Sequence, residues 1–150
     1  MKKTELILIA LALLALVLVK IDMTGAILII LFTYMLLSVF YFLFGFALFN
    51  GIDYKDILVA DTYKNIPSWK IILGIVMGWL SSIMIGGILF KVQQYPGAEL
   101  MLIVSLFPLA IMHLIAYFTF HPGTSDLIRL KLFWRNYIML VLGFVVWFAF

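Results

Sequence analysis

The sequence of 150 residues contains no cysteine, two histidines and few charged side chains. The lack of cysteine excludes disulfide bonds, thiol catalysis and cysteine metal sites. The histidines, His113 and His121, are too few for an all-histidine metal site, and we expect no cofactor. Charged residues make up 11% of the chain, against about 25% in a typical soluble domain. This composition argues against a soluble globular domain, a disordered tail and a nucleic-acid binder.

The chain is instead rich in long apolar runs, with 67% hydrophobic residues and a mean hydropathy of +1.24. A helix needs roughly 20 residues to cross the hydrocarbon core of a bilayer. Three of the runs are long enough alone, and the first becomes so when Glu5 and a snorkelling Lys20 are included. The last run extends a helix that begins near Asp126. The five runs are residues 6–19, 26–49, 71–90, 98–120 and 138–150.

These runs do not alternate polar and apolar residues as barrel strands do, so we expect helices. We therefore predict an all-α, polytopic transmembrane bundle that forms one integral-membrane domain with five spans. The turns after the first and third spans are alike, because a lysine ends one helix and Gly-Ala opens the next. The chain is thus predicted to repeat a two-helix hairpin, at residues 5–49 and 71–120, before a final helix at residues 126–150.

The positive charges predict the orientation of the spans. Five spans place the N-terminus and the loops at residues 50–70 and 121–137 on one side, together with eight Lys or Arg residues. The other side carries only Lys20 and Lys91. Cytoplasmic loops are enriched in Lys and Arg, so the N-terminus is predicted to be cytoplasmic and the C-terminus to lie at the outer face. In the first loop we expect a short interfacial helix or a docking surface for a cytoplasmic partner.

The second outer turn carries a resemblance to a known family. It reads GGILFK at residues 86–91 and YPGAELML at residues 95–102. This hairpin resembles small Bacteroidota inner-membrane proteins such as the stator subunit L of the gliding-motility and type IX secretion motor. The resemblance implies a Gram-negative inner-membrane protein, with Lys91 at a helix end and Pro96-Gly97 in a periplasmic turn. The family's histidine is Gln94 here, and its intramembrane glutamate would fall near Phe107 or Pro108, where no acid exists.

The third span contains small residues at every fourth position, which places them on one slowly drifting helix face. Small residues let helix backbones approach closely in membranes. We predict a packing seam against another helix of this chain or of a second chain. The seam consists of Gly74, Gly78, Ser82 and Gly86.

The fourth span contains His113, the only ionisable group that is predicted to lie well inside a span. Polar groups at membrane depth often mark a proton or solute path. Tyr117 follows one turn later and Ser105 lies on a neighbouring face, so these three residues form a candidate transport site. The alternative is a neutral histidine bonded to a partner helix. Pro108 removes one helical hydrogen bond and is expected to kink the same span.

A last motif lies after the fourth span, where His121 and Asp126 match the H-x4-D pattern of glycerolipid acyltransferases. Pro122-Gly123 favours a turn at this position instead, and we expect no enzyme activity. The leading hypothesis is a structural or accessory membrane subunit that acts through helix–helix contacts, as a homo-oligomer or with other membrane subunits in the lipid bilayer. The alternative is a small solute or ion transporter or channel that uses the His113 face and the Pro108 kink.

Overall fold

A computed structural model describes residues 1–64, 66–119 and 127–149, with side chains described outside residues 115–134. The described residues form five α-helices and one 3-10 helix and contain no strand, so the predicted all-α class is confirmed. The α-helices are α1 (Lys2–Lys20), α2 (Ala26–Asn50), α3 (Ser68–Val92), α4 (Ala98–Thr119) and α5 (Leu127–Ala149), and the 3-10 helix is η1 (Ala60–Tyr63).

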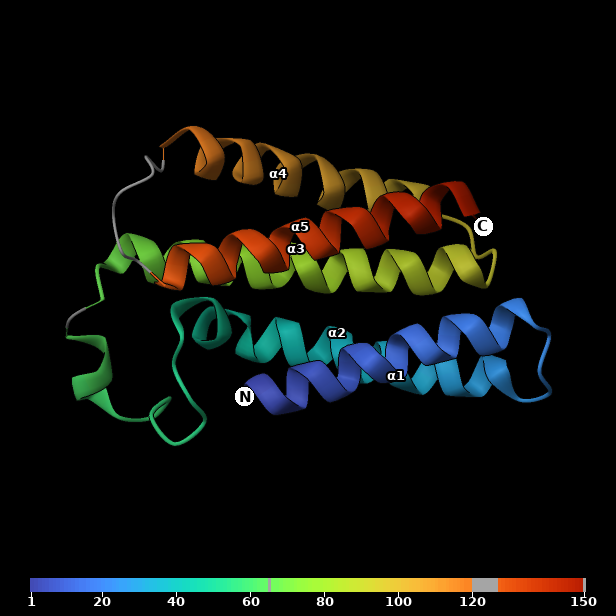
Figure 1. The fold of residues 1–150 in the computed structure, drawn as a ribbon, viewed down its shortest axis with the longest axis horizontal. Coiled ribbons are helices and arrows are strands. Elements are labelled where there is room, and N and C mark those ends of the chain that lie inside the picture. The colour runs from blue at the N-terminus through green and yellow to red at the C-terminus, as the bar shows by residue number, and fades with distance from the viewer. Residues whose placement is uncertain (65, 120–126, 150) are drawn as a thin grey trace.

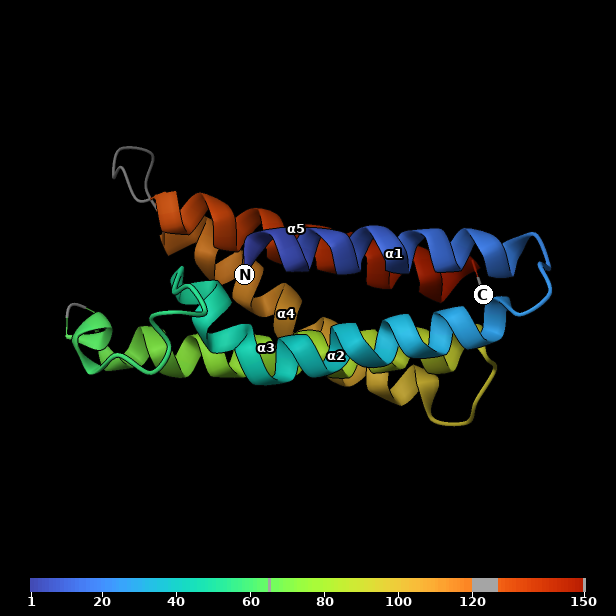
Figure 2. The same cartoon turned by 90° about the horizontal axis from the view of Figure 1, so that it is seen from below.

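The helices run along the long axis of an elongated bundle (Figure 1). One end, which we name the turn end, contains the α1–α2 and α3–α4 connections and the last residues of α5. The opposite end, named the loop end, contains residues 51–64 and 66–67, and the N-terminus lies nearer to this end than to the turn end. Figure 2 shows α1 and α5 on one side of the bundle and α2 and α3 on the other, with α4 crossing obliquely. The most extensive helix contact joins α2 to α3.

The two connections at the turn end share one backbone geometry. Asp22 and Gly25 have positive φ angles of 51° and 84°, and Gln94 and Gly97 have 57° and 87° at the same spacing. In the first turn the Met23 amide donates to the Leu18 carbonyl, and in the second the Tyr95 amide donates to the Phe90 carbonyl. Both bonds resemble those of a Schellman-type helix end. Glycine adopts the left-handed region without the steric cost that a Cβ atom brings. The lysine and Gly-Ala signals therefore mark turns of equivalent geometry.

The helix limits agree with the sequence except at one place. The fifth helix begins at Leu127, next to its expected start. Arg135, however, lies eight residues inside α5 rather than in a loop at residues 121–137, which corrects the prediction for that segment. The described residues of the loop after α2 form turns and the four-residue η1, so the short helix in this loop is a 3-10 helix. Its backbone is held by local bonds such as the one from the Tyr63 hydroxyl to the Ile57 carbonyl, 2.6 Å.

Among the described residues, α2 and α3 are long and apolar enough to cross a membrane, with mean hydropathies of 2.5 and 2.1. In the most apolar window of α2 only 33% of the residues are buried, so most of its side chains face outward. Large apolar side chains are exposed on the other α-helices as well, including Leu6, Phe107 and Phe148 at 71%, 68% and 85%. Soluble monomers rarely expose contiguous apolar surface on this scale. The structure is compatible with a membrane location.

Candidate functional site

A buried cluster of polar side chains joins three helices near the loop end. Glu5 of α1 is only 5% exposed, and Tyr41 of α2 is 1% exposed. The Tyr41 hydroxyl donates to Oε1 of Glu5 at 2.7 Å, and one guanidinium nitrogen of Arg135 donates to Oε2 at 2.7 Å. The other terminal nitrogen of Arg135 donates to the Leu48 carbonyl at 3.1 Å. Both carboxylate oxygens of Glu5 are therefore bonded, and the two opposite charges neutralise each other.

The cluster lies inside the bundle, well away from the loop-end termini of α2 and α5. Tyr41 precedes the last residue of α2 by nine positions, and Arg135 follows the first residue of α5 by eight. At ~1.5 Å per residue, these positions are about 12 to 14 Å from the helix ends. Helix α1 begins deeper in the bundle than its neighbours, as Figures 1 and 2 show at the N label. The Glu5 carboxylate is consequently at interior depth although it belongs to the first turns of its own helix.

The cluster contains two ionisable groups that the sequence did not predict to meet. Glu5 is a buried residue of α1. Arg135 is a partly buried residue of α5 that precedes the apolar run at residues 138–150. The sequence contained one usable signal, an acid in the first helix and a base in the last helix, each beside an apolar run. Nothing in the sequence showed that these distant helices meet.

Polar bonds, rather than close backbone packing, connect α1 to α5. No Cα atoms of the described residues of these two helices lie within 8 Å of each other. Near the loop end the connection is the Glu5–Arg135 ion pair. At the turn end, Nζ of Lys20 lies 3.5 Å from the carbonyl oxygen of Ala149. Long charged side chains therefore connect α1 to α5 near both ends of the bundle.

The predicted small-residue seam packs mainly against α2 of the same chain. A Cβ atom added at Gly78 would lie 2.9 Å from both the Cα of Gly45 and the carbonyl oxygen of Tyr41. Beside it, Ser82 shares a 2.9 Å side-chain hydrogen bond with Ser38. On this face the seam therefore packs against a helix of the same chain, which is one of the two alternatives that the sequence left open. Gly45 is a residue of the seam that sequence reasoning missed.

The two ends of the predicted seam differ. A Cβ atom at Gly74 would lie 2.6 Å from Nδ2 of Asn50, so this glycine also faces α2. Nδ2 of Asn50 donates to the Lys70 carbonyl at 3.2 Å and so joins the end of α2 to the start of α3. Gly86 instead faces α4, because its added Cβ would lie 3.0 Å from the terminal methyl of Met101. The four positions thus belong to two interfaces.

The candidate transport residues of α4 are not brought together into one described site. Ser105 is fully buried and donates to the Met101 carbonyl of its own helix at 2.8 Å. His113 lies against Tyr137 of α5, with ring centroids 6.0 Å apart. The side chain of Tyr117 lies outside the described residues, as do His121 and Asp126. Nearby, Asn136 of α5 donates to the Leu109 carbonyl at 3.0 Å, a buried inter-helix bond that the sequence analysis missed.

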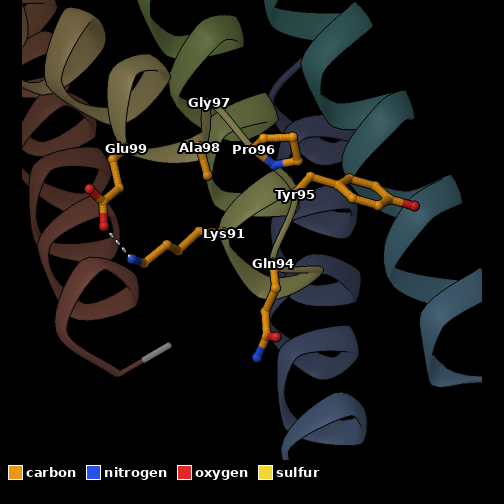
Figure 3. Close-up of a pocket in the computed structure, with 7 residues that line it drawn as sticks. All are labelled: Lys91, Gln94, Tyr95, Pro96, Gly97, Ala98 and Glu99. Carbon is orange, nitrogen blue, oxygen red and sulfur yellow. Dashed lines mark hydrogen bonds and ion pairs between the residues drawn. The ribbon is translucent and has the colours of Figure 1, made fainter.

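The residues of the second turn surround a pocket of about 340 Å³ (Figure 3). It is lined by Lys91, Gln94, Tyr95, Pro96, Gly97, Ala98 and Glu99. Nζ of Lys91 lies 3.0 Å from Oε1 of Glu99, and the glutamate side chain is 68% exposed. Figure 3 shows the tyrosine ring pointing away from this ion pair, on the opposite side of the turn. The predicted turn residues therefore lie together, and the Lys91–Glu99 pair is open to solvent.

Within the part of the chain that the structure describes, no group of three or more His, Asp or Glu side chains is placed to hold a metal ion. In the cluster near the loop end, Glu5 bonds to both Tyr41 and Arg135. No protein-family model, curated protein or solved structure matches this chain.

Proposed function

We propose that the chain is a multi-pass inner-membrane protein that serves as a structural or accessory subunit, acting through helix–helix contacts and without catalysis. One observation carries this proposal: buried and partly buried polar side chains from different helices are bonded across the helix interfaces. Glu5, Tyr41 and Arg135 bond across three helices, and Ser38 bonds to Ser82. Such bonds hold a bundle rigid, whereas a solute path needs polar groups that remain free to exchange partners.

The distribution of lysines supports the orientation expected from the sequence. Arg135 is not counted among the positive charges of the loops, because it pairs with Glu5 inside the bundle. The remaining lysines with described side chains still favour the loop end as the cytoplasmic side. Lys2, Lys3, Lys55, Lys64 and Lys70 lie in or beside the loop end, and Lys20 and Lys91 lie at the turn end. The resemblance of the second hairpin to small Bacteroidota inner-membrane proteins supports the same placement.

A partner of this subunit must use a surface other than the α2–α3 seam, because that seam is filled within the chain. Phe42 of α2 and Trp79 of α3 form a stacked aromatic pair, with ring centroids 5.8 Å apart. Both side chains remain about half exposed, at 52% and 50%. A rigid aromatic surface that spans the two best-packed helices suits a partner helix, since aromatic residues often dominate binding energy.

Co-purification tests this function. A tagged chain extracted in mild detergent should bring down a membrane protein in a fixed ratio, identified by mass spectrometry. The double variant Phe42→Ala/Trp79→Ala should lose that partner while keeping its thermal stability. Phe32→Ala is the matched control, because this α2 residue is 64% exposed and lies outside the stacked pair. A chain that purifies alone and moves an ion or solute across reconstituted vesicles would contradict the proposal and favour the transporter alternative.

A further inference from the structure

Gln93, which follows the last residue of α3, has a carboxamide whose bonding groups are unused. Neither Nε2 nor Oε1 has a hydrogen-bond partner among the described residues, and both atoms are buried. Leaving a buried polar group without a bond costs about 1–3 kcal/mol. A side chain of this kind marks a place where a group from outside the chain completes the bonding.

The same residue lines a second pocket, of about 250 Å³, at the turn end. Three α-helices contribute its apolar walls: Val19 of α1, Ile27 and Ile30 of α2, and Val92 of α3. The polar residues Gln93, Gln94 and Tyr95 complete the lining. The pocket is therefore amphipathic, with an apolar wall of helix side chains and a polar wall from the α3–α4 turn.

The position of the pocket selects its ligand. Helix α1 ends at Lys20, α2 begins at Ala26 and α3 ends at Val92, so the pocket lies where three helices end. If these helices span the bilayer as proposed above, that level is the membrane interface, where the ester groups of lipids lie. Water alone suits the pocket poorly, because each buried water needs two to four polar partners and much of the wall is apolar.

We propose that this pocket binds the glycerol-ester region of a membrane phospholipid. The first methylenes of an acyl chain pack against Val19 and Ile27, and the Gln93 side chain, whose amide is buried, turns toward the ester carbonyl and donates to it. Oε1 of Gln93 accepts from a donor of the lipid or of its hydration shell. This inference depends on the proposed membrane location but not on the structural role of the subunit.

A comparison of two lipids tests the inference directly. The purified chain is titrated with a diester phospholipid and with its diether analogue of equal chain length and headgroup, and the bound lipid is counted by native mass spectrometry. The wild-type chain should bind the diester about tenfold more tightly, because the ether lacks the carbonyl acceptor. In Gln93→Leu this preference should disappear. Equal binding of both lipids by the wild type, or a preference that persists in Gln93→Leu, would overturn the proposal.

Two neighbouring tryptophan variants provide a matched control for the pocket. Ile27 and Leu28 are 64% and 63% exposed, but only Ile27 lines the pocket. Ile27→Trp should fill the pocket and abolish binding, whereas Leu28→Trp should bind like the wild type. Equal binding by both variants would refute the site. Alkaline carbonate extraction separates the two proposals: a chain that leaves the membrane fraction contradicts the membrane function, while an integral chain without bound lipid contradicts only this inference.

Discussion

Arg135 illustrates how one side chain links distant parts of the molecule. Its guanidinium bonds to the Glu5 carboxylate and to the Leu48 carbonyl, so it touches both α1 and α2 from α5. The arginine side chain is 17% exposed and the glutamate side chain 7%. Charges at such depth are costly unless they are paired. The two residues therefore depend on each other, and neither is expected to tolerate loss of its partner.

Removing one partner of this pair should destabilise the protein strongly. We expect Glu5→Gln or Arg135→Met to lower the free energy of unfolding by about 3 kcal/mol, because the remaining charge stays buried without a partner. The double variant Glu5→Leu/Arg135→Met should recover much of this loss. Thermal unfolding in detergent measures all three. Lys91→Gln is the control and should cost under about 1 kcal/mol, since its partner Glu99 is largely exposed. Additive single losses in the double variant would disprove the coupling.

At the scale of the elements, α2 and α3 form the best-packed pair because small residues meet at their crossing. Gly45 faces Gly78, and the Ser38–Ser82 bond lies further along the same interface. Close backbone approach of this kind favours van der Waals packing in lipid, where the hydrophobic effect supplies no force between helices. The other helices are attached to this pair, α1 through α2 and α4 through α3.

Two alanine substitutions distinguish the two interfaces of α3. Gly78→Ala should destabilise the fold by about 1–3 kcal/mol, because the new Cβ atom meets backbone atoms of α2 that cannot move aside. Gly86→Ala should be neutral or stabilising by up to about 1 kcal/mol, because alanine favours a helix and only the flexible end of Met101 is near. Melting temperatures of the two variants provide the test. A larger loss for Gly86→Ala would show that the seam is wrongly assigned.

At the scale of the whole molecule, the bundle has two chemically different ends. The loop end carries the N-terminus, whose ammonium lies 3.8 Å from Asp53, and most of the lysines with described side chains. The turn end carries the two equivalent turns and the end of α5. An elongated bundle with this polarity and exposed apolar sides is suited to one fixed orientation across a bilayer.

Single cysteines will test that orientation without background labelling, because the natural sequence contains no cysteine. Met23→Cys lies at the turn end and Leu58→Cys at the loop end, at positions 50% and 95% exposed. A membrane-impermeant maleimide should label Met23→Cys from the periplasmic side. It should label Leu58→Cys only after the inner membrane is disrupted. Labelling in the reverse pattern, or of both variants in intact spheroplasts, would refute the proposed topology.

The sequence by itself determined the helices and the turns. Apolar runs, the paired lysine and Gly-Ala signals and the small residues of α3 are local features, and local features fix where a helix begins, ends or permits close approach. The start of α5 next to Asp126 and the all-α class follow from them. Residues that act alone in a turn, such as Pro96 and Gly97, were consequently found where they were expected.

Only the tertiary structure decided which distant residues meet. Glu5 and Arg135 are separated by 130 positions, and no periodicity in either helix indicates that their side chains bond. Likewise, the spacing that marked Gly78 did not reveal Gly45 as its partner, because one helix face is compatible with many neighbours. The physical reason is that local pattern sets the shape of each helix, while the pairing of buried charges and small residues depends on how all the helices pack together.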